Sequence, residues 1–463
     1  MGYTGEISSS ELSDNYYILR RYRSGDQIGR DGVEAVFEEK LRGRDGKELV
    51  EIDATGGVVR SLGKDPPAIG NSVTLAIDAK LSENVRHAFP EGQKGAVIVS
   101  KPQTGEIMAF YSSPSFDPNL LTQGAGEADL QALESPDNPF FDRALAGVYP
   151  PGSTYKIIVA LAALEEGIID ANSTIEDTGV LTVGQFSFAN WYYTQYGKTE
   201  GLVDVTKALR RSNDIFFYQI GQKLGITRLS AWSRLAGIGQ PLGIELAGAV
   251  SGLVPDPAWK ARQFNTAADI RAGNNLWYDG DTYHMAIGQG YLLATPLHVN
   301  VWTNIVASGG YLCQPTILKV GESSHRKNCQ RLDIAAPTLK LVERGLIGAC
   351  ERGGTGWPFF DFRVATLKPD EDQTATATGL MVNSKRIHVA CKTGTAEISR
   401  ETASTHAWFT VYGPVSAEIT PSDQTEQSIM PEISVTVLVE SGGEGSYIAA
   451  PIAKSIMADW FSR

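Results

Sequence analysis

Short apolar runs with the spacing of β-strands gather in two parts of the chain. Residues 95–100 and 106–111 form the first pair, and the polar turn between them predicts a β-hairpin. Residues 386–391, 407–412 and 433–440 form three later runs, each with the length and β-branched content of a strand. If these runs share one sheet, its strands come from distant parts of the chain.

Helical patterns occupy most of the chain between these two groups. Residues 130–350 are predicted to be mainly helical, and the stretch 157–164 is apolar on nearly all sides, which is typical of a buried helix. A further strand is predicted at 73–78 before a helix that ends near residue 88, and a last helix at 449–461. This order predicts an α+β fold with one antiparallel sheet flanked by helices.

The N-terminal region, residues 1–70, is predicted to be a small separate domain, followed by a main domain at 71–463. It contains an amphipathic helix at 32–41 and a hairpin across 49–60. The proline pair in 64–67 predicts the linker between the two domains.

Charge and hydropathy exclude several classes of protein. The 463 residues include 41 Lys and Arg against 53 Asp and Glu, which gives a net charge of −12 and argues against a nucleic-acid groove. No apolar stretch approaches the ~20 residues that span a bilayer, and the N-terminus lacks the pattern of a signal peptide. Taken literally, the chain is soluble and intracellular; alternatively, it is a fragment whose membrane anchor has been removed.

Four cysteines are too few for a disulfide framework in a chain of this length, and none has CxxC spacing. We therefore expect Cys313, Cys329, Cys350 and Cys391 to be free and mostly buried thiols.

A serine three residues before a lysine occurs three times, at Ser61, Ser153 and Ser324. Only Ser153 precedes a buried helix, where its hydroxyl would face unpaired backbone N–H groups and the positive end of the helix dipole. Lys156 lies on the same helical face and would accept the serine proton if it were neutral. The alternative is that Ser153 only caps a core helix.

Two further motifs lie downstream. Lys392, Thr393 and Gly394 follow a β-branched run, so they are predicted at a strand edge, where a cation and a hydroxyl suit a ligand ending in a carboxylate. Burial and a second cation lower an ammonium pKa, and Lys392 would be that cation for Lys156. Ser212 and Asp214 flank one residue before an apolar run, which is also ordinary helix-capping chemistry.

Taken in order, these three motifs resemble those of the class B penicillin-binding proteins, the transpeptidases that cross-link peptidoglycan. The matching residues are Ser153 and Lys156, then Ser212 and Asp214, then Lys392, Thr393 and Gly394. The resemblance covers roughly residues 70–463, and residues 1–70 resemble part of the family's N-terminal pedestal or dimerisation region. It is strongest to members of the cell-elongation type, with the division-specific type as the nearest alternative. It implies a five-stranded antiparallel sheet.

The resemblance also implies roles for these residues. Ser153 would attack the penultimate D-Ala carbonyl of a stem peptide, with Lys156 as the base. Ser212, with Asp214 orienting both it and Lys156, would pass the proton to the leaving D-Ala. The serine ester would then be opened by an amine from a neighbouring strand, or blocked by a β-lactam that mimics the donor.

On the substrate side, Lys392 and Thr393 would hold the terminal carboxylate beside Gly394, and the N–H groups of Ser153 and Thr395 would form the oxyanion hole. The 175–214 region has no cysteine or histidine, so we expect no metal and no cofactor.

The implied partners are stem peptides, β-lactams and a membrane glycan polymerase, without nucleic acid. The implied location is the periplasmic face of the inner membrane, for a chain lacking its anchor. A D,D-carboxypeptidase, a serine β-lactamase and a non-catalytic β-lactam sensor or scaffold remain as alternatives.

Overall fold

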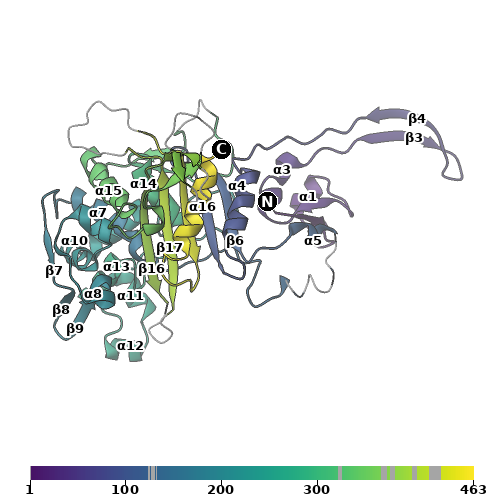
Figure 1. The fold of residues 1–463 in the computed structure, drawn as a ribbon. Coiled ribbons are helices and arrows are strands. Elements are labelled where there is room, and N and C mark those ends of the chain that lie inside the picture. Colours follow the sequence, from purple (N-terminus) through teal and green to yellow (C-terminus); the bar gives the residue numbers. More distant parts are fainter. Residues whose placement is uncertain are drawn as a thin grey trace. The chain divides into compact units, whose positions relative to one another are not determined.

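The computed structural model describes residues 2–123, 126, 131, 133–321, 326–365, 373–375, 381–398, 404–416 and 429–463 (Figure 1). The chain divides into two compact units. The first contains Met1–Leu75, Phe116–Phe140 and Glu245–Ala247, and the second contains the rest. Within the described ranges, no helix is both long and apolar enough to cross a membrane.

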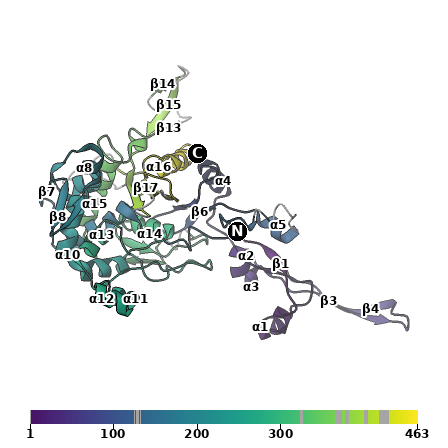
Figure 2. The same ribbon diagram turned by 90° about the horizontal axis from the view of Figure 1, so that it is seen from below.

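A five-stranded antiparallel sheet forms the centre of the second unit (Figures 1 and 2). Its strands lie in the order β16 (Ala390–Glu397), β17 (Thr405–Gly413), β18 (Ile433–Val439), β5 (Gly95–Ser100) and β6 (Ile107–Ser113). Val437 of β18 lies opposite Val97 of β5, which joins the C-terminal strands to the earlier hairpin. The predicted α+β fold, with one sheet built from distant parts of the chain, is confirmed.

Helices cover both faces of this sheet. Val437 packs in a core cluster with α4 (Ala79–Ala88) and α16 (Ala449–Phe461). The next residue, Leu438, points to the opposite face and joins the cluster that contains α7 (Lys156–Glu165) and α14 (Pro296–Ala307). Both faces of β18 and β5 are buried, which explains the high apolar content of these strands.

Helices dominate 130–350, as predicted. Besides α7 and α14 they are α8 (Trp191–Tyr196), α9 (Val205–Arg211), α10 (Asp214–Leu235), α11 (Pro257–Gln263), α12 (Ala267–Ala272), α13 (Asp279–Ala286) and α15 (Ala336–Ala349). The sequence pattern did not predict the strand pairs between them, which are β7 (Ile175–Asp177) with β10 (Gly201–Val203), β8 (Val180–Val183) with β9 (Phe186–Ala189), and β11 (Tyr311–Cys313) with β12 (Cys329–Arg331).

The first unit is built from short elements. They are β1 (Thr4–Glu6), α1 (Asn15–Leu19), β2 (Gln27–Gly29), α2 (Gly32–Val36), α3 (Glu38–Leu41), β3 (Lys47–Ile52), β4 (Val58–Asp65) and α5 (Pro118–Gln123). The predicted hairpin is confirmed as β3 and β4. The predicted helix at 32–41 is two helices that meet at Phe37, and the predicted linker overlaps the end of β4.

Two strand predictions were wrong, the first because no strand forms and the second in its bounds. Residues 73–78 form no strand, because their backbone bonds go to single partners, from Ala76 N to Ile317 O and from Asp78 N to Met108 O, both at 2.8 Å. The strand predicted at 386–391 begins only at Ala390 and continues through the lysine motif to Glu397. Arg386, the first residue of the predicted strand, instead ends β15 (Met381–Arg386). In a separate small sheet, β15 pairs with β13 (Arg363–Ala365) and β14 (Gln373–Ala375).

Candidate active site

A tight turn carries Ser153 at the start of a buried helix. Residues Gly152–Tyr155 form a 3-10 turn that runs directly into α7. Gly152 adopts a φ of +54°, a left-handed conformation that favours glycine, and its N–H donates to the carbonyl of Gly288 at 2.8 Å. The buried helix predicted behind Ser153 is confirmed, since its residues from Lys156 to Ala163 are all buried.

The amine of Lys156 lies at the centre of the site and is fully buried. Its Nζ donates to Asp214 Oδ1 at 2.6 Å and to the carbonyl of Ser212 at 2.8 Å, and it lies 3.4 Å from Ser212 Oγ. The Ser153 hydroxyl makes no side-chain hydrogen bond among the residues that the structure describes. Catalytic hydrogen bonds are often long before a substrate is bound, so this geometry is compatible with a serine–lysine pair.

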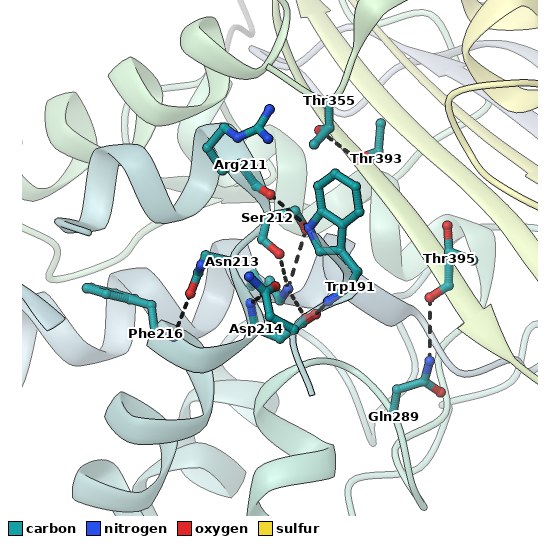
Figure 3. A network of polar contacts seen from close by, with 12 residues as sticks. Trp191, Arg211, Ser212, Asn213, Asp214, Phe216, Gln289, Thr355, Thr393 and Thr395 are labelled. Carbon is teal, nitrogen blue, oxygen red and sulfur yellow. Dashed lines mark hydrogen bonds and ion pairs between the residues drawn. The ribbon is translucent and has the colours of Figure 1, made fainter. Parts of the chain in front are cut away.

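Ser212 and Asp214 reach Lys156 from the junction between α9 and α10 (Figure 3). Ser212 ends α9 with a φ of +53°, and Asp214 is the first residue of α10. The cap of α10 is the residue between them, Asn213, whose side chain accepts the N–H of Phe216 at 2.9 Å. The capping alternative is therefore correct for Asn213, while its two neighbours point to the lysine.

A buried polar network that the sequence pattern did not reveal supports this junction. Trp191 N donates to Asp214 Oδ2 at 3.0 Å (Figure 3). Asp214 N donates to the side chain of Asn190 at 3.1 Å. Asp177 accepts from the side-chain amides of Asn190 and Asn213, each at 2.9 Å. No sequence spacing indicates Asp177, because its partners are 13 and 36 residues away along the chain.

The third motif contacts Ser212 from strand β16. Lys392 Nζ is fully buried and donates to Ser212 Oγ at 2.8 Å and to the carbonyl of Thr393 at 3.0 Å. The Thr393 hydroxyl donates to the hydroxyl of Thr355 at 2.8 Å (Figure 3). Thr355 was also absent from the sequence prediction, since it lies in an irregular loop after α15.

The same strand lies against the turn that carries Ser153. A Cβ placed on Gly152 would lie 2.8 Å from the carbonyl oxygen of Thr395, and one on Gly394 would lie 2.9 Å from Thr154 Cγ2. Gln289 Nε2 also donates to that Thr395 carbonyl at 3.4 Å (Figure 3). The structure therefore brings the three predicted motifs together, and it places the backbone of Thr395 beside that of Gly152.

Burial is the main influence on the two amines. It lowers the pKa of Lys156, while the charge of Asp214 acts in the opposite direction. It also lowers the pKa of Lys392 well below its ordinary value, and the neighbouring Lys156 lowers it further. Because one carboxylate faces two buried amines, the site favours a neutral amine that can accept a proton. We predicted that burial and the cation Lys392 would together lower the pKa of Lys156; burial does so, whereas the effect of one lysine on the other is found at Lys392.

The prediction of free thiols was wrong. Cys313 is bonded to Cys329, and Cys350 to Cys391. The antiparallel pairing of β11 with β12 places Cys313 directly opposite Cys329, whereas Cys350 follows α15 and meets Cys391 on β16. The sequence separations, 16 and 41 residues, do not reveal contacts that only the tertiary structure creates.

Other predicted features can be placed. Ser61 and Lys64 lie exposed on β4 in the first unit, and Ser324 lies outside the described residues. In the described part of the chain, no group of three His, Cys, Asp or Glu side chains is arranged to hold a metal ion. The expected absence of a metal stays a prediction.

Family comparison assigns both parts of the chain. Residues 95–458 match the penicillin binding protein transpeptidase domain, and residues 1–75 match the penicillin-binding protein dimerisation domain. The Haemophilus influenzae peptidoglycan D,D-transpeptidase MrdA is 33% identical over 473 residues, covering 99% of this chain and 67% of the relative. The chain thus spans about two thirds of the relative's length.

Solved structures agree. Pseudomonas aeruginosa PBP2 in complex with WCK 5153 has a TM-score of 0.77 and 29% identity, covering 99% of this chain and 87% of that one. PBP2 from the Helicobacter pylori complex with MreC also has a TM-score of 0.77, at 27% identity, with 99% and 76% of the two chains covered.

Proposed function

The chain belongs to the penicillin-binding protein transpeptidase family, and from this premise we propose that it cross-links peptidoglycan stem peptides through an acyl-enzyme on Ser153. The family prediction is confirmed. One observation carries the proposed chemistry: the three motifs meet at Ser212. Its Oγ lies 2.8 Å from the Lys392 amine and 3.4 Å from the Lys156 amine.

In the acylation step, Ser153 Oγ bonds to the penultimate D-Ala carbonyl carbon and gives its proton to neutral Lys156. The oxyanion lies between the N–H groups of Ser153 and Thr395, which the close approach of Gly152 to Thr395 supports. As the peptide bond breaks, Ser212 relays a proton from Lys156 to the leaving D-Ala amine, consistent with its 3.4 Å distance from that lysine.

In the second step, the amine of an acceptor strand attacks the ester carbonyl, loses a proton to the same relay and releases Ser153. Thr393 exchanges its 2.8 Å hydrogen bond to Thr355 for one to the donor's terminal carboxylate, and Lys392 supplies positive potential beside it. Gly394 lets β16 pack closely against the turn that carries Ser153, because a Cβ there would come within 2.9 Å of both Thr154 Cγ2 and Trp408 Cβ. Asp214 holds Lys156 in place through the 2.6 Å ion pair.

The nature of the product tests this proposal. A stem peptide ending in D-Ala-D-Ala is incubated with an acceptor amine, and the products are separated and weighed by mass spectrometry. We expect release of one D-Ala per cross-linked dimer. D-Ala release without dimers would identify a carboxypeptidase, rapid turnover of penicillin would identify a β-lactamase, and absence of any acyl-enzyme would identify a sensor or scaffold.

Acylation by penicillin should accelerate as the pH rises. Burial lowers the pKa of Lys156 from its ordinary 10.5, so the neutral amine becomes populated at lower pH than in a free lysine. The same shift should make the folded protein more stable as the pH rises through this window, because unfolded lysines still bind protons there. The measurement is the acylation rate constant across neutral and alkaline pH.

The variant Asp214→Asn is a control for this pH dependence, because it should shift the profile in a known direction. The charge of Asp214 raises the Lys156 pKa, so its removal should move the rise in rate to lower pH. A rise centred at the ordinary lysine pKa in the native protein, or no displacement in the variant, would contradict the role of Lys156 as base.

We propose two kinds of partner in addition. The H. pylori PBP2 structure is a complex with MreC, which supports a scaffold protein of that type, together with the membrane glycan polymerase that the family resemblance implies. We place the protein on the extracytoplasmic side of the inner membrane, and its two disulfides support this location, since such bonds persist mainly in oxidising compartments.

A further inference from the structure

Strand β16, which carries Lys392, lies at the edge of the central sheet. Among the described strands only β17 pairs with it in this sheet, so these ladder hydrogen bonds hold it from one side. The amine of Lys392 must nevertheless stay within 2.8 Å of Ser212, which belongs to the helical part of the unit. A structure that couples β16 to those helices would therefore control this distance.

The disulfide between Cys350 and Cys391 provides such a coupling. Cys391 is adjacent to Lys392 on the strand, so the two side chains leave β16 in opposite directions. The Cys391 side chain lies in the core cluster that also contains Cys350 and Phe359, and both cysteines are buried. One covalent bond thus joins the back of the strand to the end of α15.

Helix α15 in turn packs closely on α9, the helix that ends at Ser212. A Cβ placed on Gly345 would lie 2.7 Å from Leu209 Cβ, so glycine permits close approach of the two helices. The last residues of α9 also bind the loop that follows Cys350: Arg210 donates to the carbonyl of Arg352, and Arg211 donates to that of Gly353 at 2.9 Å. The path from Ser212 through α9, α15 and the disulfide to Lys392 is continuous.

The loop after Cys350 packs against the disulfide and makes a second contact with β16. Gly356 N donates to the carbonyl of Ala349 at 2.8 Å, and a Cβ on Gly356 would lie only 2.6 Å from Cys391 Sγ. The preceding residue, Thr355, accepts the hydrogen bond of Thr393 at 2.8 Å. Both neighbours of Lys392 along the strand are therefore held by the segment 350–356.

We propose that Cys350 and Cys391 are positioning residues for the acyl-transfer site, because their disulfide holds β16 at the distance that Lys392 requires from Ser212. They touch neither substrate nor the reacting atoms and act through the strand. This inference rests on the proposed function, since its effect is read in the acylation of Ser153.

The second disulfide offers a matched control. Cys313 and Cys329 join β11 to β12, and among the described residues their side chains form no hydrogen bond with the three motifs; their sulfurs lie 3.8 Å and 3.7 Å from the carbonyl oxygen of Gln103. The variants Cys313→Ala/Cys329→Ala and Cys350→Ala/Cys391→Ala each lose one disulfide. A general loss of stability would appear in both, whereas displacement of β16 would appear only in the second.

The experiment measures the rate constant and the final stoichiometry of acylation by a fluorescent penicillin, together with the melting temperature. We expect the 350/391 variant to be labelled to completion but on the order of tenfold more slowly, because small displacements of catalytic groups carry large rate penalties. The 313/329 variant should be labelled at the native rate. The single variant Cys350→Ala, which retains the Cys391 side chain as packing, replaces the double variant if that one does not fold.

Equal rates in the two double variants, or a loss confined to the fraction of protein labelled, would overturn the inference and assign the disulfide a purely structural role. Failure of the native protein to be labelled at all would instead overturn the proposed function. The two failures are thus distinguishable.

Discussion

Replacing Ser153 with alanine is expected to abolish acylation. The variant removes the only atom that can form the ester, and loss of a nucleophile lowers acyl-transfer rates by about 10⁶-fold in serine enzymes. Intact mass spectrometry after exposure to penicillin should show the native protein heavier by one antibiotic molecule and the variant unchanged. Ser153 is only partly exposed and makes no side-chain hydrogen bond among the described residues, so the fold should tolerate the change.

The variant Ser61→Ala is the matched control. Ser61 also stands three residues before a lysine, but it lies exposed on the β3–β4 hairpin of the first unit. It should be labelled at the native rate. Stoichiometric labelling of Ser153→Ala would refute the acyl-enzyme on this serine and require another nucleophile.

Replacing Lys156 with methionine should have the second largest effect. Loss of a general base lowers rates by about 10²–10⁴-fold, so penicillin acylation should fall within this range. The variant should also lose stability, because Lys156 is fully buried and its removal leaves Asp214 without its 2.6 Å ion-pair partner. Breaking one side of a buried pair costs about 3–5 kcal/mol, which thermal unfolding would detect as a lower melting temperature.

The double variant Lys156→Met/Asp214→Asn separates the two effects. Without the unpaired carboxylate, stability should recover in large part, since buried pairs can be replaced by neutral side chains at little cost. The asparagine can still accept the N–H of Trp191, which Asp214 accepts at 3.0 Å. Acylation should remain slow. If acylation recovered with stability, Lys156 would have a structural role and another group would be the base.

Much of the fold was predictable because it depends on local composition. The strands at 95–100 and 433–439 are rich in apolar residues, and the helix residues 157–164 are apolar on nearly all sides, so burial of these elements was already indicated. Where bounds were wrong, neighbours decided them. The strand at Ala390–Glu397 includes the polar lysine motif because pairing with β17 continues through it, against its local hydrophobic pattern.

The candidate site was predictable only in part, and for the same reason. Ser153, Lys156, Ser212, Asp214 and Lys392 stand in short motifs whose residue types indicate their chemistry. Asp177, Asn190 and Thr355 do not, because each acts through hydrogen bonds to residues far away along the chain.

The sequence by itself determined the fold class, the order of the three motifs and the chemical types that they bring together, since these follow from local pattern and side-chain chemistry. The tertiary structure alone decided which cysteines pair, how closely Asp214 approaches Lys156 and which buried groups act on the pKa of each lysine. The physical reason is that electrostatic environment and covalent pairing depend on distances in space, and chain folding sets these distances between residues that no local pattern connects.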